Sequence, residues 1–222
     1  MQIGSTPSLG TAAALDVGTS ANQVVQLNGS AQLPAVSGAL LTNLPSGSGS
    51  GVGYVAGRFY APSVIDGSET AKLANTLYLM AFEIERTTVF TKIGIHVFTA
   101  SAGNARLGIY NGTAGIPSTL VLDCGTVSTG TTGDKEITIS QSLSPGVYFL
   151  VVVFDATPTT YSMAAGDLRP FWARVYGAAT SGGVPAISAT VAFTYGALPS
   201  PYNLGALTYD TSNASPSIWL RP

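Results

Sequence analysis

The sequence is poor in charge and in the residue types from which most catalytic and metal sites are built. Only 9% of its 222 residues are charged, whereas an average soluble protein carries roughly 25%. It has one histidine, His96, and one cysteine, Cys124, which excludes an intramolecular disulfide and a structural zinc site of the usual composition. Nine basic residues against eleven acidic ones provide no basic surface for phosphates, so we expect no nucleic-acid partner.

Long hydrophobic runs are also missing. The longest, VYFLVVVF at 147–154, is far shorter than the roughly 20 residues that a membrane helix needs. The N-terminal stretch MQIGSTPSLGTAAAL has no basic region and no apolar core, unlike a secretory signal. We therefore expect that the chain is made in a cytoplasm and is not inserted into a membrane.

Candidate catalytic groups are few, and each has a simpler structural explanation. His96 lies in IGIHVF, a segment whose two faces are both apolar, so we expect a structural histidine in or beside the core. Glu83 and Glu85, two residues apart on a predicted strand, would point the same way at roughly 6–7 Å, which resembles a glycosidase pair. A solvated strand face beside Arg86 and Lys92 explains them more simply. We therefore predict that the chain is not an enzyme and uses no cofactor or metal.

What the sequence does contain is a β-pattern that starts at about residue 54. Short segments that alternate apolar and polar residues are separated by turn signals such as Asn111-Gly112 and Pro145-Gly146. This spacing is typical of an antiparallel β-sandwich of the jelly-roll type and not of a parallel α/β sheet. The predicted strands are 77–85, 89–98, 105–110, 119–127, 135–140, 146–154, 189–195 and 217–220.

The composition divides the chain into three parts. Residues 1–45 are small and polar, 46–53 (SGSGSGVG) form a flexible joint, and 54–222 make the predicted sandwich domain. Asn28-Gly29 favours a hairpin turn, but an isolated hairpin is marginal in water. We therefore expect residues 1–45 to pack against other copies of the chain. The predicted contact residues are Val25, Leu27, Leu33, Val36, Leu40 and Leu44.

Aromatic residues are dense in the last third of the chain, among polar loops. Aromatic rings pack on the apolar faces of sugars while neighbouring polar groups bond to the hydroxyls, so such loops suit glycan binding. The alternative is that these rings close the sandwich or a subunit interface. Our candidate receptor-binding residues are Tyr161, Trp172, Tyr176 and Tyr202.

The segment GTAAALDVGTSANQVVQLNGSAQLPAVSGALLTNLP at 10–45 resembles the connector segments of tail fibres and head fibres of tailed bacteriophages and related particles. The stretches FEIERTTVFTKIGIHV, ARLGIYNGTAGIPSTLVLDCGTV and SLSPGVYFLVVVFD are similar to the β-sandwich tip domains of such fibres. This resemblance implies a homotrimer on the surface of a virion or phage-like particle. Its N-terminal part would attach to other virion proteins, on the head or on the tail. Its C-terminal domain would bind a host polysaccharide or another surface receptor.

Two functions from other classes remain open. One is a stand-alone carbohydrate-binding module, which would not need the connector of residues 10–45. The other is a capsule-degrading spike, for which we would expect acidic pairs in a groove and a long repetitive β-helix. The order of preference is fibre adhesin, lectin-like module, then depolymerase.

Overall fold

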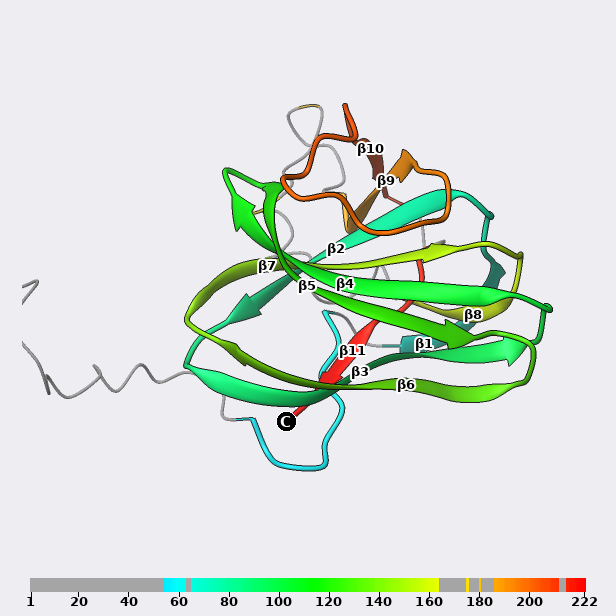
Figure 1. Cartoon of the computed structure of the whole chain (residues 1–222), viewed down its shortest axis with the longest axis horizontal. Coiled ribbons are helices and arrows are strands. Elements are labelled where there is room, and N and C mark those ends of the chain that lie inside the picture. Colours follow the sequence, from blue (N-terminus) through cyan, green and yellow to red (C-terminus); the bar gives the residue numbers. More distant parts are fainter. Residues whose placement is uncertain (1–53, 63–64, 164–174, 176–179, 181–185, 212–214) are drawn as a thin grey trace, which may run out of the picture. The chain divides into compact units, whose positions relative to one another are not determined.

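The computed structural model describes residues 54–62, 65–163, 175, 180, 186–211 and 215–222. The chain divides into two compact units, Met1–Ser48 and Gly49–Pro222, and all described residues belong to the second (Figure 1). The predicted contact residues Val25, Leu27, Leu33, Val36, Leu40 and Leu44 therefore lie outside the described residues, as do Trp172 and Tyr176.

The described residues form two antiparallel β-sheets, which confirms the predicted antiparallel sandwich (Figure 1). In the five-stranded sheet, β6 pairs with one edge of β3 while β8 and β11 pair with the other edge, and β1 lies outside β8. Its strands are β1 (Ile65–Ala71), β3 (Thr88–Thr99), β6 (Gly133–Leu143), β8 (Thr159–Met163) and β11 (Trp219–Arg221).

The second sheet has six strands in the order β10-β9-β2-β7-β4-β5. Its strands are β2 (Thr76–Ile84), β4 (Asn104–Thr113), β5 (Ile116–Ser128), β7 (Gly146–Phe154), β9 (Ser188–Ala192) and β10 (Thr208–Asp210). Within the described residues, no helix is long and apolar enough to cross a membrane.

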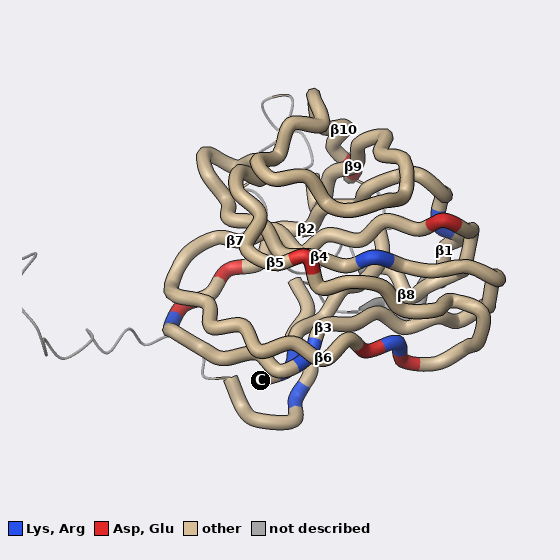
Figure 2. Tube along the Cα trace, viewed as in Figure 1, with Lys and Arg blue, Asp and Glu red and all other residues tan. Residues whose placement is uncertain are grey.

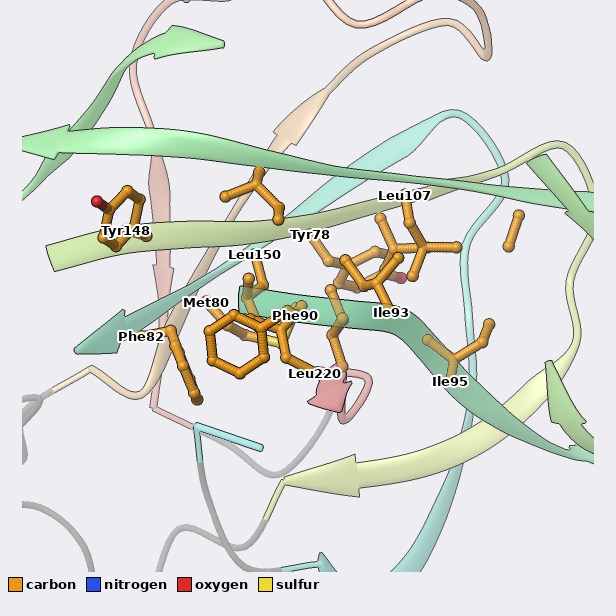
Figure 3. Close-up of a cluster of buried hydrophobic side chains, with 14 of the residues drawn as sticks. Tyr78, Met80, Phe82, Phe90, Ile93, Ile95, Leu107, Tyr148, Leu150 and Leu220 are labelled. Carbon is orange, nitrogen blue, oxygen red and sulfur yellow. The ribbon is translucent and has the colours of Figure 1, made fainter. Parts of the chain in front are cut away.

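The main hydrophobic core lies between the two sheets and is built from alternate residues of the facing strands (Figure 3). On β3, the side chains of Ile93, Ile95 and Val97 point into this core and have no exposed surface. Alternation on a strand therefore sends the intervening side chains to the outer face. The opposite sheet contributes Tyr78, Met80, Phe82, Ile84, Ala105, Leu107, Ile109, Tyr148, Leu150, Val152 and Phe154.

The outer face of the six-stranded sheet carries a second hydrophobic cluster. There Leu79 of β2 and Val151 of β7 are covered by the segment 193–207. This segment is fastened by two hydrogen bonds, from Tyr110 Oη to the Pro199 carbonyl (2.6 Å) and from the Tyr202 amide to the Ser118 carbonyl (2.7 Å). Both faces of β7 are thus buried, which explains why its sequence is an uninterrupted apolar run.

One predicted turn is misplaced. Asn111-Gly112 lies inside β4, and the chain reverses at Ala114 and Gly115, whose φ angles are 52° and 79°. Two successive positive φ angles suit the tight hairpin turn that the flanking strands require. Gly112 instead allows close approach of the neighbouring strand, because a Cβ there would lie 2.7 Å from the Val147 carbonyl oxygen.

Candidate ligand-binding surface

Four side chains form a row across adjacent strands on the outer face of the five-stranded sheet. Glu69 of β1 lies opposite Tyr161 of β8, and His96 of β3 lies opposite Asp134 of β6. The rings of Tyr161 and His96 stack, with centroids 4.5 Å apart and planes inclined by 21°. We call Glu69, Tyr161, His96 and Asp134 the acid–aromatic row. With strands about 4.8 Å apart, it is about 14 Å long.

The strand pattern explains why these side chains face outward. Ile95 and Val97 fill the core, so His96 between them points away from it. On β8, Thr160 and Ser162 are buried, so Tyr161 also points outward. The expectation that His96 lies in or beside the core is therefore wrong.

The imidazole ring of His96 is positioned by two contacts, one at a ring nitrogen and one on a ring face. Its Nδ1 lies 2.6 Å from Asp134 Oδ1, and Tyr161 covers one ring face. The side chain keeps 29% of its surface exposed, and that of Asp134 keeps 54%. The carboxylate therefore orients the ring and still has surface available for a hydroxyl or amine of a ligand.

Further aromatic rings flank the row. Phe98, the next outward residue on β3, is 45% exposed and has its centroid 6.1 Å from that of Tyr161. Gly94 is the outward residue on β3 on the other side of His96, and the indole ring of Trp219 lies over it. Phe59 packs edge-on against that indole at 4.6 Å. An exposed aromatic surface thus adjoins the acid–aromatic row.

Basic side chains on this face are engaged in ion pairs. Lys92 Nζ contacts Glu136 Oε2, and Arg221 Nη2 reaches the same oxygen at 3.1 Å. The Arg221 guanidinium also lies 5.3 Å from the centroid of Phe59. Figure 2 shows how few Lys, Arg, Asp and Glu positions the traced chain carries. The two ends of the row are the carboxylates of Glu69 and Asp134, and neither of them is paired with Lys92 or Arg221.

The row offers binding contacts: flat rings, carboxylate oxygens and one imidazole. Within the part of the chain that the structure describes, no hydroxyl or thiol is hydrogen-bonded to His96. No group of three or more His, Cys, Asp or Glu side chains there is arranged to hold a metal ion. Cys124 is partly buried, and burial raises the pKa of its thiol to about 12.

The candidate receptor-binding residues do not gather in one place. Tyr161 lies in the acid–aromatic row, whereas Tyr202 packs on the opposite outer face of the sandwich, edge-on to Tyr110 at 6.0 Å. The Tyr202 hydroxyl is buried without a partner among the described residues, and burial raises its pKa to about 12. The sequence analysis did not identify His96, Phe98 and Asp134 as binding residues, because only the strand register brings them to Tyr161.

A second polar cluster is buried at the edge where β1 and β8 approach β9 and β10. Lys72 is 0% exposed, and its Nζ donates a hydrogen bond of 3.0 Å to Ser162 Oγ. Burial lowers the pKa of this amine to about 7. Nearby, Ser215 Oγ lies 2.5 Å from Ser188 Oγ and donates to Asp210 Oδ2 at 3.3 Å. This cluster joins the two sheets and presents no accessible side chain from Lys72 or the three serines.

Comparison with known proteins identifies no family. No family model matches the chain, and no curated protein matches it. Among solved structures, a clostridial cysteine protease, Cwp84 after propeptide cleavage, is similar over 74% of this chain and 40% of that one. The TM-score is 0.43 and the sequence identity 13%. A likeness this distant has no bearing on activity.

Proposed function

We propose that this chain is a fibre or spike protein of a phage or phage-like particle, and that its β-sandwich binds a glycan on the host surface. The observation that carries the binding function is the stacked pair of Tyr161 and His96, half-buried beside the exposed side chains of Phe98 and Asp134. Rings of this kind pack on the apolar face of a sugar, and carboxylate oxygens accept hydrogen bonds from its hydroxyls.

The particle assignment rests on the connector-like sequence at 10–45. In this proposal residues 1–45 form the homotrimer contact and attach to other virion proteins. The alternative is a lectin-like module that binds a glycan through the same surface without particle attachment. The two differ in oligomeric state and not in the binding surface, so the mass of the chain in solution separates them.

The binding function is tested by removing the ring at the centre of the surface. Tyr161→Ala is expected to reduce binding to host cells and to a glycan microarray by at least about fivefold, since a stacked aromatic contact contributes on the order of 1–3 kcal/mol when fully used. Phe98→Ala is expected to reduce it less, because that ring flanks the row.

The matched control is Tyr209→Ala, which removes a 49% exposed tyrosine from β10 in the other sheet. It should bind as the unmodified chain does. Thermal unfolding of each variant shows whether the fold is intact. Unchanged binding by a folded Tyr161→Ala variant would refute this placement and return attention to Trp172, Tyr176 and Tyr202, whose receptor role stays a prediction.

A further inference from the structure

We propose that the acid–aromatic row selects against acidic saccharides and binds an amine-bearing sugar more tightly than the same sugar in its N-acetylated form. This inference rests on the proposed glycan-binding function and adds the class of glycan. The observation behind it is that the two stacked rings lie between two outward carboxylates, Glu69 and Asp134.

Both carboxylates are available to a ligand. Glu69 is exposed on β1 directly opposite Tyr161, and antiparallel partners in register present their side chains on the same face. Asp134 bonds to His96 through Oδ1 and still has 54% of its side chain exposed. A sugar stacked on the central rings would therefore meet an acid at each end of the row.

The basic side chains on the strands of this sheet are directed to groups other than Glu69 and Asp134. The strands carry two lysines and one arginine. Lys92 and Arg221 both contact Glu136. Lys135 Nζ turns to the preceding loop and donates to Thr131 Oγ1 at 2.6 Å and to the Thr132 carbonyl at 3.1 Å. These three cations keep their charge, but within the described residues none of them pairs with Glu69 or Asp134. A ligand carboxylate that contacts Glu69 or Asp134 would therefore meet a like charge, which repels it.

The size of the expected effect follows from Coulomb's law. A unit charge at about 4 Å in water changes an affinity about fivefold. A ligand ammonium near Glu69 or Asp134 gains this factor, and an acidic group loses it. An ammonium can also interact favourably with the electron-rich face of an aromatic ring such as Phe98 or Tyr161. N-acetylation removes the positive charge and with it both contributions.

The test uses the full chain on a microarray of saccharides that differ in charge: glucosamine oligomers, N-acetylglucosamine oligomers, neutral glucose oligomers of the same linkage, and oligogalacturonate. The first two share one backbone and differ only in N-acetylation. We expect glucosamine oligomers to bind about five- to tenfold more tightly than their N-acetylated counterparts, and oligogalacturonate to bind most weakly. The preference should weaken as salt rises, because exposed charges are screened.

Two charge-removing variants link the preference to the row. Asp134→Asn keeps an oxygen that can accept a hydrogen bond from His96, and Glu69→Gln keeps the side-chain length. Each should lower the amine preference about two- to threefold, since the two carboxylates share the five- to tenfold effect, and should improve binding of oligogalacturonate. Glu85→Gln is the control, because it removes one exposed carboxylate outside this sheet. It should leave the preference unchanged.

The outcomes separate the two proposals. If acidic saccharides bind as tightly as neutral ones, or if Asp134→Asn and Glu69→Gln leave the preference unchanged, this inference is overturned while glycan binding stands. If no saccharide binds to the unmodified chain at any salt concentration, the proposed function is overturned, and this inference with it.

Discussion

The indole ring of Trp219 occupies the space in which a side chain on Gly94 would begin. The two residues are register partners on β11 and β3, and a Cβ on Gly94 would overlap the indole and lie 2.5 Å from the Lys135 carbonyl oxygen. The glycine therefore lets the indole lie close over β3 beside the acid–aromatic row. Phe59 then closes over the indole and leaves it almost fully buried.

Replacing this glycine should destabilise the sandwich. Gly94→Ala forces either the indole or the β6 backbone to move, and overpacking of this kind costs about 1–3 kcal/mol. Urea unfolding followed by tryptophan fluorescence measures the change in the free energy of unfolding. Gly196→Ala is the control, since its nearest neighbour would be 3.7 Å away. Equal stabilities for the two variants would show that the indole does not depend on the missing side chain.

The buried amine of Lys72 should make stability depend on pH. Its pKa is lowered to about 7 in the folded chain and is about 10.4 in an unfolded one. Between these values the unfolded state binds more protons, so stability rises with pH, by at most about 1.4 kcal/mol per pH unit. Burial raises the pKa of the Cys124 thiol, so above the ordinary thiol pKa of about 8.5 this group makes stability fall as pH rises. The effect of Lys72 is therefore best measured between about pH 7 and 8.5.

Lys72→Met tests this relationship directly. Methionine fills much of the same volume without a titrating group, so its free energy of unfolding should be nearly constant across that window. The unmodified chain should gain stability over the same range in chemical denaturation experiments. A parallel pH dependence in both chains would assign the effect to another group.

The Asp123 carboxylate should hold the covering segment 193–207 in place. It accepts a bidentate pair from Arg106, with Nη2–Oδ2 at 2.7 Å and Nε–Oδ1 at 2.9 Å, and also a bond from the Leu198 amide at 3.1 Å. Asp123→Ala should cost about 2–3 kcal/mol, because it leaves a partly buried guanidinium and an amide without their acceptor. Hydrogen exchange at the Leu198 amide should become faster.

A matched control for this effect is Asp155→Ala. Asp155 also accepts two hydrogen bonds, from the backbone amide and the side-chain amide of Asn104. Among the described residues it makes no hydrogen bond to the covering segment. Its loss should leave exchange at Leu198 unchanged. Faster exchange in both variants would mean that the segment responds to general destabilisation and not to Asp123.

The sequence predicts the strands whose inward residues are apolar. Alternation is clear in β3, where one side chain in two enters the core, and β2 is recognisable as an apolar run because both of its faces are buried. By contrast, β8 was not predicted, because its inward residues are Thr160 and Ser162. Its inner face therefore meets a buried polar cluster that includes Lys72, and a pattern of polar residues on both faces cannot be distinguished from a loop.

The candidate site is harder to predict from the sequence than the fold is. Tyr161 was singled out from its aromatic, loop-like surroundings, but His96 and Asp134 are 38 residues apart in the chain and meet only through the pairing of β3 with β6. Register depends on turn geometry and bulges, such as the irregularity between Phe90 and Lys92, which the sequence does not reveal. The row could therefore be recognised only once the sheet was assembled.

The oligomeric state separates the fibre from the stand-alone lectin. Residues 1–45 have too few apolar side chains to bury a face alone, so we expect light scattering to give a mass near three chains for the full protein. A chain that starts at Gly53 keeps every described strand and should be a monomer. A full-length monomer would favour the lectin-like module. A trimer that persists without residues 1–52 would move the contact into the sandwich, where outward residues such as Val89 and Ile116 are exposed.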